Sequence, residues 1–166
     1  MIRRLERYSP PGYDVRTEFG YIANLVVFSL LFSFLFFWRF QKAYELLFGY
    51  EDGIKVLLPN AQMPTFESLS RFSSSFLRML PLWVSNFIRY RYNYFNVETK
   101  SGYVMLRLPQ RSEYHKRCWA IPFAFIILSY LLIFLLNVLY FTYYKNLVPL
   151  SAWPPGQSMN LWSVIL

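Results

Sequence analysis

Residues 118–144 read CWAIPFAFIILSYLLIFLLNVLYFTYY and contain no charged side chain. This block is longer than the roughly 20 apolar residues that a helix needs to cross a hydrocarbon core of about 30 Å. A second uncharged block, residues 21–38, is also long enough to cross. The chain has 166 residues, of which 55% are hydrophobic, and the apolar residues are concentrated in such blocks. We therefore predict an all-α integral membrane protein that crosses the cell membrane several times.

The order of the blocks predicts one membrane domain with three transmembrane helices. Its expected parts are a cytoplasmic leader 1–20, a first span 21–40, an external loop 43–75, a second span 76–94, a cytoplasmic loop 95–118, a third span 119–142 and an external tail 145–166. Arginines and Pro81 interrupt the second span, so a re-entrant or interfacial helix is its alternative. Within the external loop, residues 44–58 are expected to form a short interfacial helix or a hairpin.

The distribution of Lys and Arg predicts the orientation. The leader has four basic residues and residues 89–117 have seven, whereas residues 43–75 have two and the tail has one. The positive-inside rule then places the N-terminus inside and the C-terminus outside. A net charge of +8 is also typical of nucleic-acid binders, but here the cations gather beside apolar spans, so no nucleic-acid partner is expected. The first apolar run is too long for a signal peptide and lacks a cleavage site, which predicts an uncleaved span.

The sequence offers little chemistry for an enzyme. It has one His and one Cys, and no acidic residue within the predicted spans, so we expect no catalytic residue and no resident cofactor. His115 and Cys118 are spaced to share a helix face, but no third ligand accompanies them and no metal site is expected. The chain has no phosphate-binding Gly-x-x-x-x-Gly-Lys-Ser/Thr motif, so any ATP and Mg²⁺ would belong to a partner subunit. Asn137 is the most polar residue of the third span and is expected to pack against another helix.

The loop before the third span carries short apolar residues between Gly102 and Pro109, namely Tyr103, Met105, Leu106 and Leu108. Two interpretations follow from the residues alone. The apolar face can dock into a groove of a partner protein. It can instead lie on the membrane, with lipid phosphates bound by Arg107, Arg111, Lys116 and Arg117.

A resemblance to a known family favours docking. Residues 98–116 read ETKSGYVMLRLPQRSEYHK and precede a span. With its span, external loop and second span, the chain resembles the first half of a type-2 ABC exporter permease. In that family a cytoplasmic segment of the form Glu-x-x-x-Gly, apolar residues, Leu-x-Pro, a basic residue and Lys is the coupling element that meets the ATPase. Residues 100–118 are also similar to small membrane proteins of gut Firmicutes associated with ABC ATPases, whose tails carry a Pro-Gly-Gln element like residues 155–157.

The resemblance implies a transmembrane subunit of an ATP-driven exporter that docks an ABC ATPase subunit. The docking residues would be Glu98, Gly102, Tyr103, Met105, Leu106, Arg107, Leu108, Pro109 and Arg111. A full permease has six spans, so a chain of three spans would pair with a second permease subunit or a second copy of itself, within membrane lipid. The aromatic content suits a peptide or lipid-like amphiphile as cargo. The alternatives are a non-transporting assembly or regulatory subunit and a lipid-binding membrane scaffold.

Overall fold

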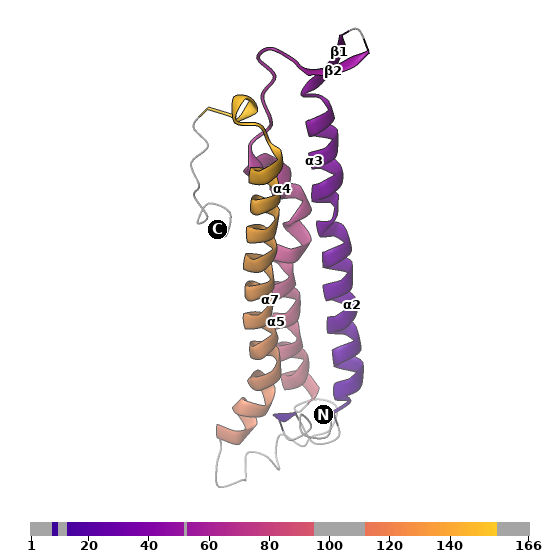
Figure 1. The fold of residues 1–166 in the computed structure, drawn as a ribbon. Helices are drawn as coiled ribbons and strands as arrows, with labels where there is room; N and C mark the ends of the chain where they lie inside the picture. The colour runs from indigo at the N-terminus through magenta and orange to yellow at the C-terminus, as the bar shows by residue number, and fades with distance from the viewer. Residues whose placement is uncertain (1–7, 10–12, 52, 95–111, 156–166) are drawn as a thin grey trace. The chain divides into compact units, whose positions relative to one another are not determined.

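The computed structural model describes residues 8–9, 13–51, 53–94 and 112–155, and these residues are mostly helical (Figure 1). Its elements in chain order are α2 (Val15–Ser33), α3 (Leu35–Glu45), β1 (Phe48–Glu51), β2 (Ile54–Leu57), α4 (Phe66–Ser73), α5 (Ser75–Asn93), α7 (Ser112–Leu147) and the 3₁₀ turn η3 (Leu150–Ala152). The two strands form an antiparallel hairpin in which Phe48 lies opposite Leu57. The predicted all-α class is therefore correct for the long elements, and the hairpin is an addition to it.

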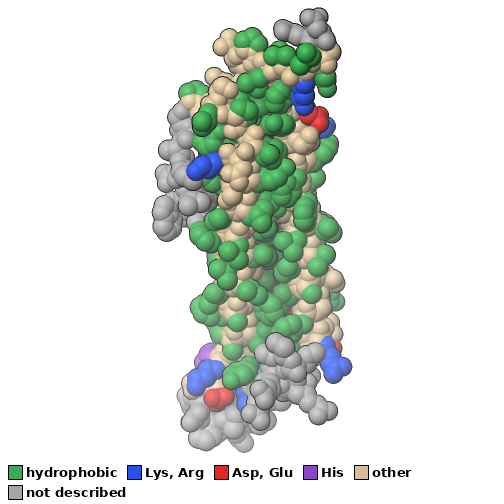
Figure 2. All heavy atoms as spheres, viewed as in Figure 1, with side chains coloured by type: hydrophobic (Ala, Val, Ile, Leu, Met, Phe, Trp, Pro, Cys, Tyr) green, Lys and Arg blue, Asp and Glu red, His purple; other side chains and the backbone are tan. Residues whose placement is uncertain are grey.

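Two of the described helical stretches are long and apolar enough to cross a membrane. They are Val15–Glu45, which comprises α2 and α3 and has a mean hydropathy of 2.1, and Ser112–Leu147, which is α7 and has a mean hydropathy of 2.5. Only 22% of the apolar window in each stretch is buried inside the structure, whereas the core helix of a soluble protein buries most of its apolar residues. Hydrophobic side chains accordingly cover much of the visible surface (Figure 2). Both stretches contain the apolar blocks from which the first and third spans were predicted, and they indicate a membrane location.

Both of these helices begin earlier than the apolar blocks. Helix α2 starts at Val15 because Asp14 caps it: its Oδ1 accepts hydrogen bonds from the backbone N–H groups of Arg16 and Thr17, at 3.0 and 3.3 Å. The Thr17 hydroxyl also lies 2.5 Å from Asp14 Oδ2. Helix α7 likewise starts at Ser112, ahead of the predicted residue 119. Hydropathy marks the apolar part of a helix, whereas capping groups determine where its hydrogen bonding begins.

Helix α5 lies where the second span was predicted, and it continues through Pro81. Its 19 residues include Arg78, Arg89 and Arg91, so it is not among the described helices that are apolar enough to cross a membrane by composition. The predicted helix is confirmed, and its crossing of the membrane stays a prediction.

The predicted external loop 43–75 is largely structured. A hairpin, one of the two alternatives for residues 44–58, forms from β1 and β2. Gly53 lies between the strands with φ of +77°, a conformation that favours glycine, and Asp-Gly is typical of a two-residue hairpin turn. Helix α4 was not predicted. Its apolar side buries Phe66 and Leu69, and its polar composition had suggested a loop.

The Thr65 hydroxyl caps α4 by accepting a hydrogen bond from the Ser68 N–H at 3.4 Å. Thr65→Ala is expected to lower the free energy of unfolding by about 1 kcal/mol, because an orphan N–H at the helix start loses its partner. Thr65→Ser keeps the hydroxyl and should stay near the wild type. Unfolding of both variants by SDS in mixed micelles measures the difference, and equal losses would show that the cap contributes nothing.

The chain divides into two compact units. The first comprises Met1–Ser29 and Met79–Leu131, and the second comprises Leu30–Arg78 and Leu132–Leu166. Within the second unit, α3 and α4 are in contact. Its core is rich in aromatic side chains from α3, α4 and α7, which are Phe36, Phe40, Phe66, Tyr140, Phe141 and Tyr144. The first unit contains the candidate site.

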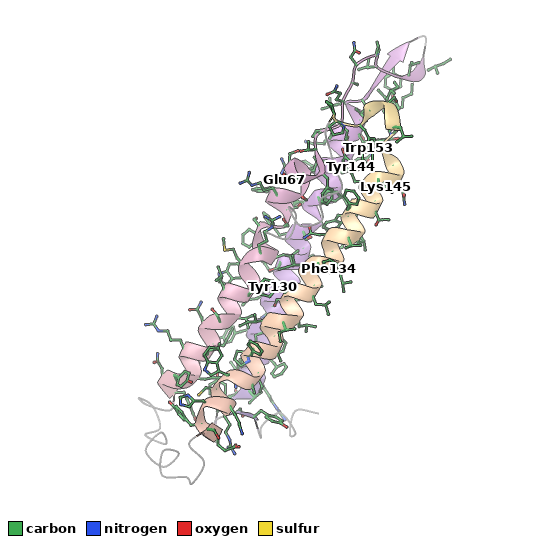
Figure 3. The ribbon with its side chains drawn as sticks, turned by 90° about the vertical axis from the view of Figure 1, so that its left-hand side faces the viewer. Glu67, Tyr130, Phe134, Tyr144, Lys145 and Trp153 are labelled. Carbon is green, nitrogen blue, oxygen red and sulfur yellow. The ribbon has the colours of Figure 1, made fainter. Side chains whose placement is uncertain are left out.

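Two tyrosines of the second unit's core form hydrogen bonds with residues outside α7. The Ser33 and Tyr140 hydroxyls are 2.6 Å apart, and the Tyr144 hydroxyl donates to the Pro64 carbonyl at 2.9 Å. The ring of Trp153, just after η3, meets the ring of Tyr144 edge-on with centroids 6.0 Å apart (Figure 3). These bonds satisfy polar groups that the surrounding apolar side chains would otherwise leave without partners.

Candidate functional site

A buried ion pair joins α2 and α5 within the first unit. The Arg91 Nη2 lies 2.6 Å from Glu18 Oε2, and Arg91 Nε lies 3.2 and 3.1 Å from the two carboxylate oxygens. Both side chains are almost completely buried, with exposed fractions of 0% for Arg91 and 1% for Glu18. A guanidinium that meets a carboxylate through two nitrogens keeps both charges paired, which burial requires.

The same guanidinium also contacts α7 and the leader. Arg91 Nη1 donates to the Arg117 carbonyl at 2.8 Å and to the Tyr8 carbonyl at 3.3 Å. The Tyr13 ring centroid lies 5.2 Å from the guanidinium carbon, within the range of a cation–π interaction. One side chain thus joins four parts of the chain, and we call Arg91 with these partners the Arg91 centre.

A second group of contacts joins the end of α5 to the start of α7. The Tyr92 hydroxyl is 2.8 Å from His115 Nδ1 and accepts a hydrogen bond from Trp119 Nε1 at 3.0 Å. The Tyr92 hydroxyl thus contacts two side chains of α7. Cys118 is buried and a free thiol, and its neighbour Tyr114 packs edge-on against Tyr92 with centroids 5.4 Å apart. The end of α5 and the start of α7, which residues 95–111 connect in the sequence, are therefore in direct side-chain contact.

A cavity of about 660 Å³ lies within the first unit, beside Glu18 and between the start of α2 and the end of α5. Its aromatic lining residues are Tyr13, Tyr21, Trp83, Phe87, Tyr90 and Tyr94, and the others are Asp14, Thr17, Glu18, Leu25 and Asn86. Three of the rings meet edge-on: the Tyr13 centroid is 5.2 Å from that of Tyr94 and 6.2 Å from that of Tyr90. We call this space the aromatic cavity.

Two groups at the rim of the aromatic cavity keep defined protonation states. Hydrogen bonds from the Thr17 hydroxyl and N–H hold the pKa of Asp14 below its usual value, so this carboxylate stays ionised. Burial, followed by the nearby Glu18 charge, raises the pKa of Tyr13 well above its usual value, so this phenol stays neutral. The rim therefore carries a permanent negative charge beside uncharged aromatic rings.

The predicted docking residues Glu98, Gly102, Tyr103, Met105, Leu106, Arg107, Leu108, Pro109 and Arg111 lie outside the described residues. The described chain resumes at Ser112, where Glu113 pairs with Lys116 at 3.6 Å and with Arg117 at 3.7 Å. His115 is exposed while Cys118 is buried. No group of three or more potential metal ligands occurs among the described residues.

Asn137 is buried on α7, with an exposed fraction of 4%. Its Nδ2 has no hydrogen-bond partner among the described residues. It lies one helical turn from Tyr140, on the side of α7 that faces the core of the second unit.

The sequence analysis missed the Arg91 centre. It placed Glu18 in the leader and treated Arg91 as an interruption near the inner end of a span. Two features of the sequence could have indicated it: Glu18 lies directly before an apolar block, and Arg91 lies in the second predicted span. Because the two charges are 73 positions apart in the sequence, they are recognisable as partners only when the packing of the helices is known. Comparison with known proteins returned no family model, curated relative or solved structure that matches this chain.

Proposed function

We propose that the chain is a transmembrane subunit of an ATP-driven ABC exporter complex, which docks an ATPase subunit through residues 98–117. The observation that carries the proposal is the Arg91 centre. It joins the end of α5 to the start of α7, the two helices that residues 95–111 connect, and it joins both to the start of α2. A displacement of the docked loop would therefore be passed to all three helix ends together, as rigid-body coupling requires.

In this proposal the chain lies in the plasma membrane with three spans, its N-terminus inside and its C-terminus outside. Helix α5 is the second span despite its arginines. Arg91 is neutralised by Glu18. The polar side chains on its exposed side bond to their own helix, since Ser85 Oγ and Asn86 Nδ2 both donate to the Leu82 carbonyl, at 2.7 and 3.2 Å. Such bonds reduce the cost of polar groups in lipid.

The partners in this proposal are those of an ABC exporter. An ABC ATPase subunit would supply ATP and Mg²⁺, and a second permease subunit or a second copy of this chain would complete the six spans. The apolar outward faces of α2 and α7 support contact with membrane lipid and with such a partner; Val27, Leu31, Ile127 and Leu131 are each more than half exposed. The cargo would be a peptide or lipid-like amphiphile.

The docking loop is tested by co-purification. Met105→Asp combined with Leu108→Asp should abolish recovery of an ATPase subunit with the tagged chain, since two carboxylates in an apolar groove cost several kcal/mol. The measurement is the yield of ATP-binding protein after purification from its own cells in mild detergent at moderate salt.

A matched control puts the same charges on the hairpin, which the proposed topology places outside. Ile54 and Val56 are exposed on β2 by 67% and 41%, and their double change to Asp should leave the ATPase yield unchanged. ATPase binding that survives the loop change would contradict the proposal. A lower yield of ATPase with an unaltered specific ATPase rate would favour the non-transporting assembly subunit. Binding of the chain to anionic vesicles alone, abolished by high salt, would favour the lipid-binding scaffold.

A further inference from the structure

The aromatic cavity has the size and lining of a small-molecule site. Its volume of about 660 Å³ falls within the range of roughly 300–1,000 Å³ typical of ligand pockets. Aromatic rings come from both helices and from Tyr13 just before α2, so they can enclose a ligand from several sides. Polar groups are few: Thr17 and Asn86 add a hydroxyl and an amide to the two carboxylates.

The charge of the lining is opposite to that of the protein. The chain has 17 Lys and Arg against 9 Asp and Glu, yet none of the described residues that line the aromatic cavity is basic, and two are acidic. The Glu18 carboxylate is already occupied by Arg91. Asp14 forms no ion pair among the described residues: it accepts hydrogen bonds from the N–H groups of Arg16 and Thr17 and from the Thr17 hydroxyl, and the nearby Arg16 charge is the last of the causes that lower its pKa. The Asp14 carboxylate therefore adds a negative charge beside the rings that no ion pair among the described residues neutralises.

We propose that the aromatic cavity binds a lipophilic organic cation, whose charge lies over the Tyr90 ring and faces Asp14. Aromatic faces attract cations that have few hydrogen-bond donors of their own, such as quaternary ammonium and phosphonium ions, and the apolar rings accept their substituents. An anion would be repelled by the Asp14 carboxylate and by the negative faces of the rings. This inference goes beyond the proposed function and does not depend on an ATPase partner, because the lining residues belong to one unit of one chain.

The test uses tetraphenylphosphonium and tetraphenylborate, two ions of the same shape and opposite charge, titrated separately into the purified full chain by calorimetry. Heats from empty dodecylmaltoside micelles are subtracted. Tetraphenylphosphonium should bind with one site per chain and at least about tenfold more tightly than tetraphenylborate, because the ring faces and the carboxylate both favour the cation.

Two variants locate the binding. Tyr90→Leu should weaken tetraphenylphosphonium binding about fivefold through loss of one ring face. Asp14→Asn should weaken it to a similar extent, while an Asn at the helix start still caps α2. The matched control is Tyr130→Leu, since Tyr130 lies on α7 outside the cavity and is 59% exposed, close to the 54% of Tyr90 (Figure 3). It should bind as the wild type does.

A last experiment asks whether the bound cation is a soluble molecule or a lipid headgroup. Phosphatidylcholine carries a quaternary ammonium group in its headgroup and could occupy the same site. The titration is repeated in nanodiscs of phosphatidylglycerol, alone and with half phosphatidylcholine. Unchanged binding supports a soluble cation, and weaker binding with phosphatidylcholine supports the cation site while assigning it to the headgroup. Equal affinity for the two tetraphenyl ions would overturn the proposal. Binding that Tyr90→Leu and Asp14→Asn change no more than Tyr130→Leu does would overturn it as well.

Discussion

Arg91→Met is expected to lower the free energy of unfolding by about 3–5 kcal/mol, because Glu18 is left as a buried charge without a partner. The carbonyls of Tyr8 and Arg117 lose their donor in the same change. Unfolding by SDS in mixed micelles, followed by circular dichroism, measures the loss.

Arg89→Met is the matched control for this change. Arg89 lies two residues away on the same helix and is exposed, so removal of its charge should have little effect on stability. Replacing both buried charges, as Glu18→Leu with Arg91→Met, should recover most of the stability, since apolar residues of similar volume often substitute for a buried ion pair. If Arg91→Met and Arg89→Met unfold at the same SDS fraction, the buried ion pair is not the source of stability.

Phe36→Ala is expected to lower the free energy of unfolding by about 3–5 kcal/mol, the usual cost of removing a fully buried ring. Phe36 has an exposed fraction of 0%, and its ring stacks on Tyr140 with centroids 4.5 Å apart and an interplanar angle of 14°. It also meets the Phe66 ring at 5.8 Å. Removing it opens a cavity between α3, α4 and α7 in the core of the second unit.

Phe34→Ala is the control, because Phe34 lies two residues earlier, carries the same ring and is 60% exposed. Its only ring contact among those described is with Phe37, at 5.9 Å. The same SDS titration should show a loss well below that of Phe36→Ala. Equal losses would mean that α3 does not bury Phe36 in preference to Phe34.

Some local elements were predictable because short-range chemistry determines them. The uncharged runs predicted the two long apolar helices, since length and hydropathy are properties of the sequence alone. The hairpin was one of two alternatives predicted for residues 44–58, and the Asp-Gly pair before Ile54 is a local signal that favours it over a helix. Helix α4 was missed because Ser68, Ser70 and Ser73 suggest a loop. Within the helix their hydroxyls bond to backbone carbonyls three or four residues earlier, and Phe66 and Leu69 supply the buried side.

The sequence by itself determined which segments are apolar enough to cross a membrane, because that property depends only on consecutive side chains. The tertiary structure alone decided that Glu18 and Arg91 are partners and that aromatic residues of α2 and α5 enclose a cavity. Each of these features needs residues far apart in the chain to face one another. The helix rotations that bring them together follow from packing across the whole unit and not from any local pattern.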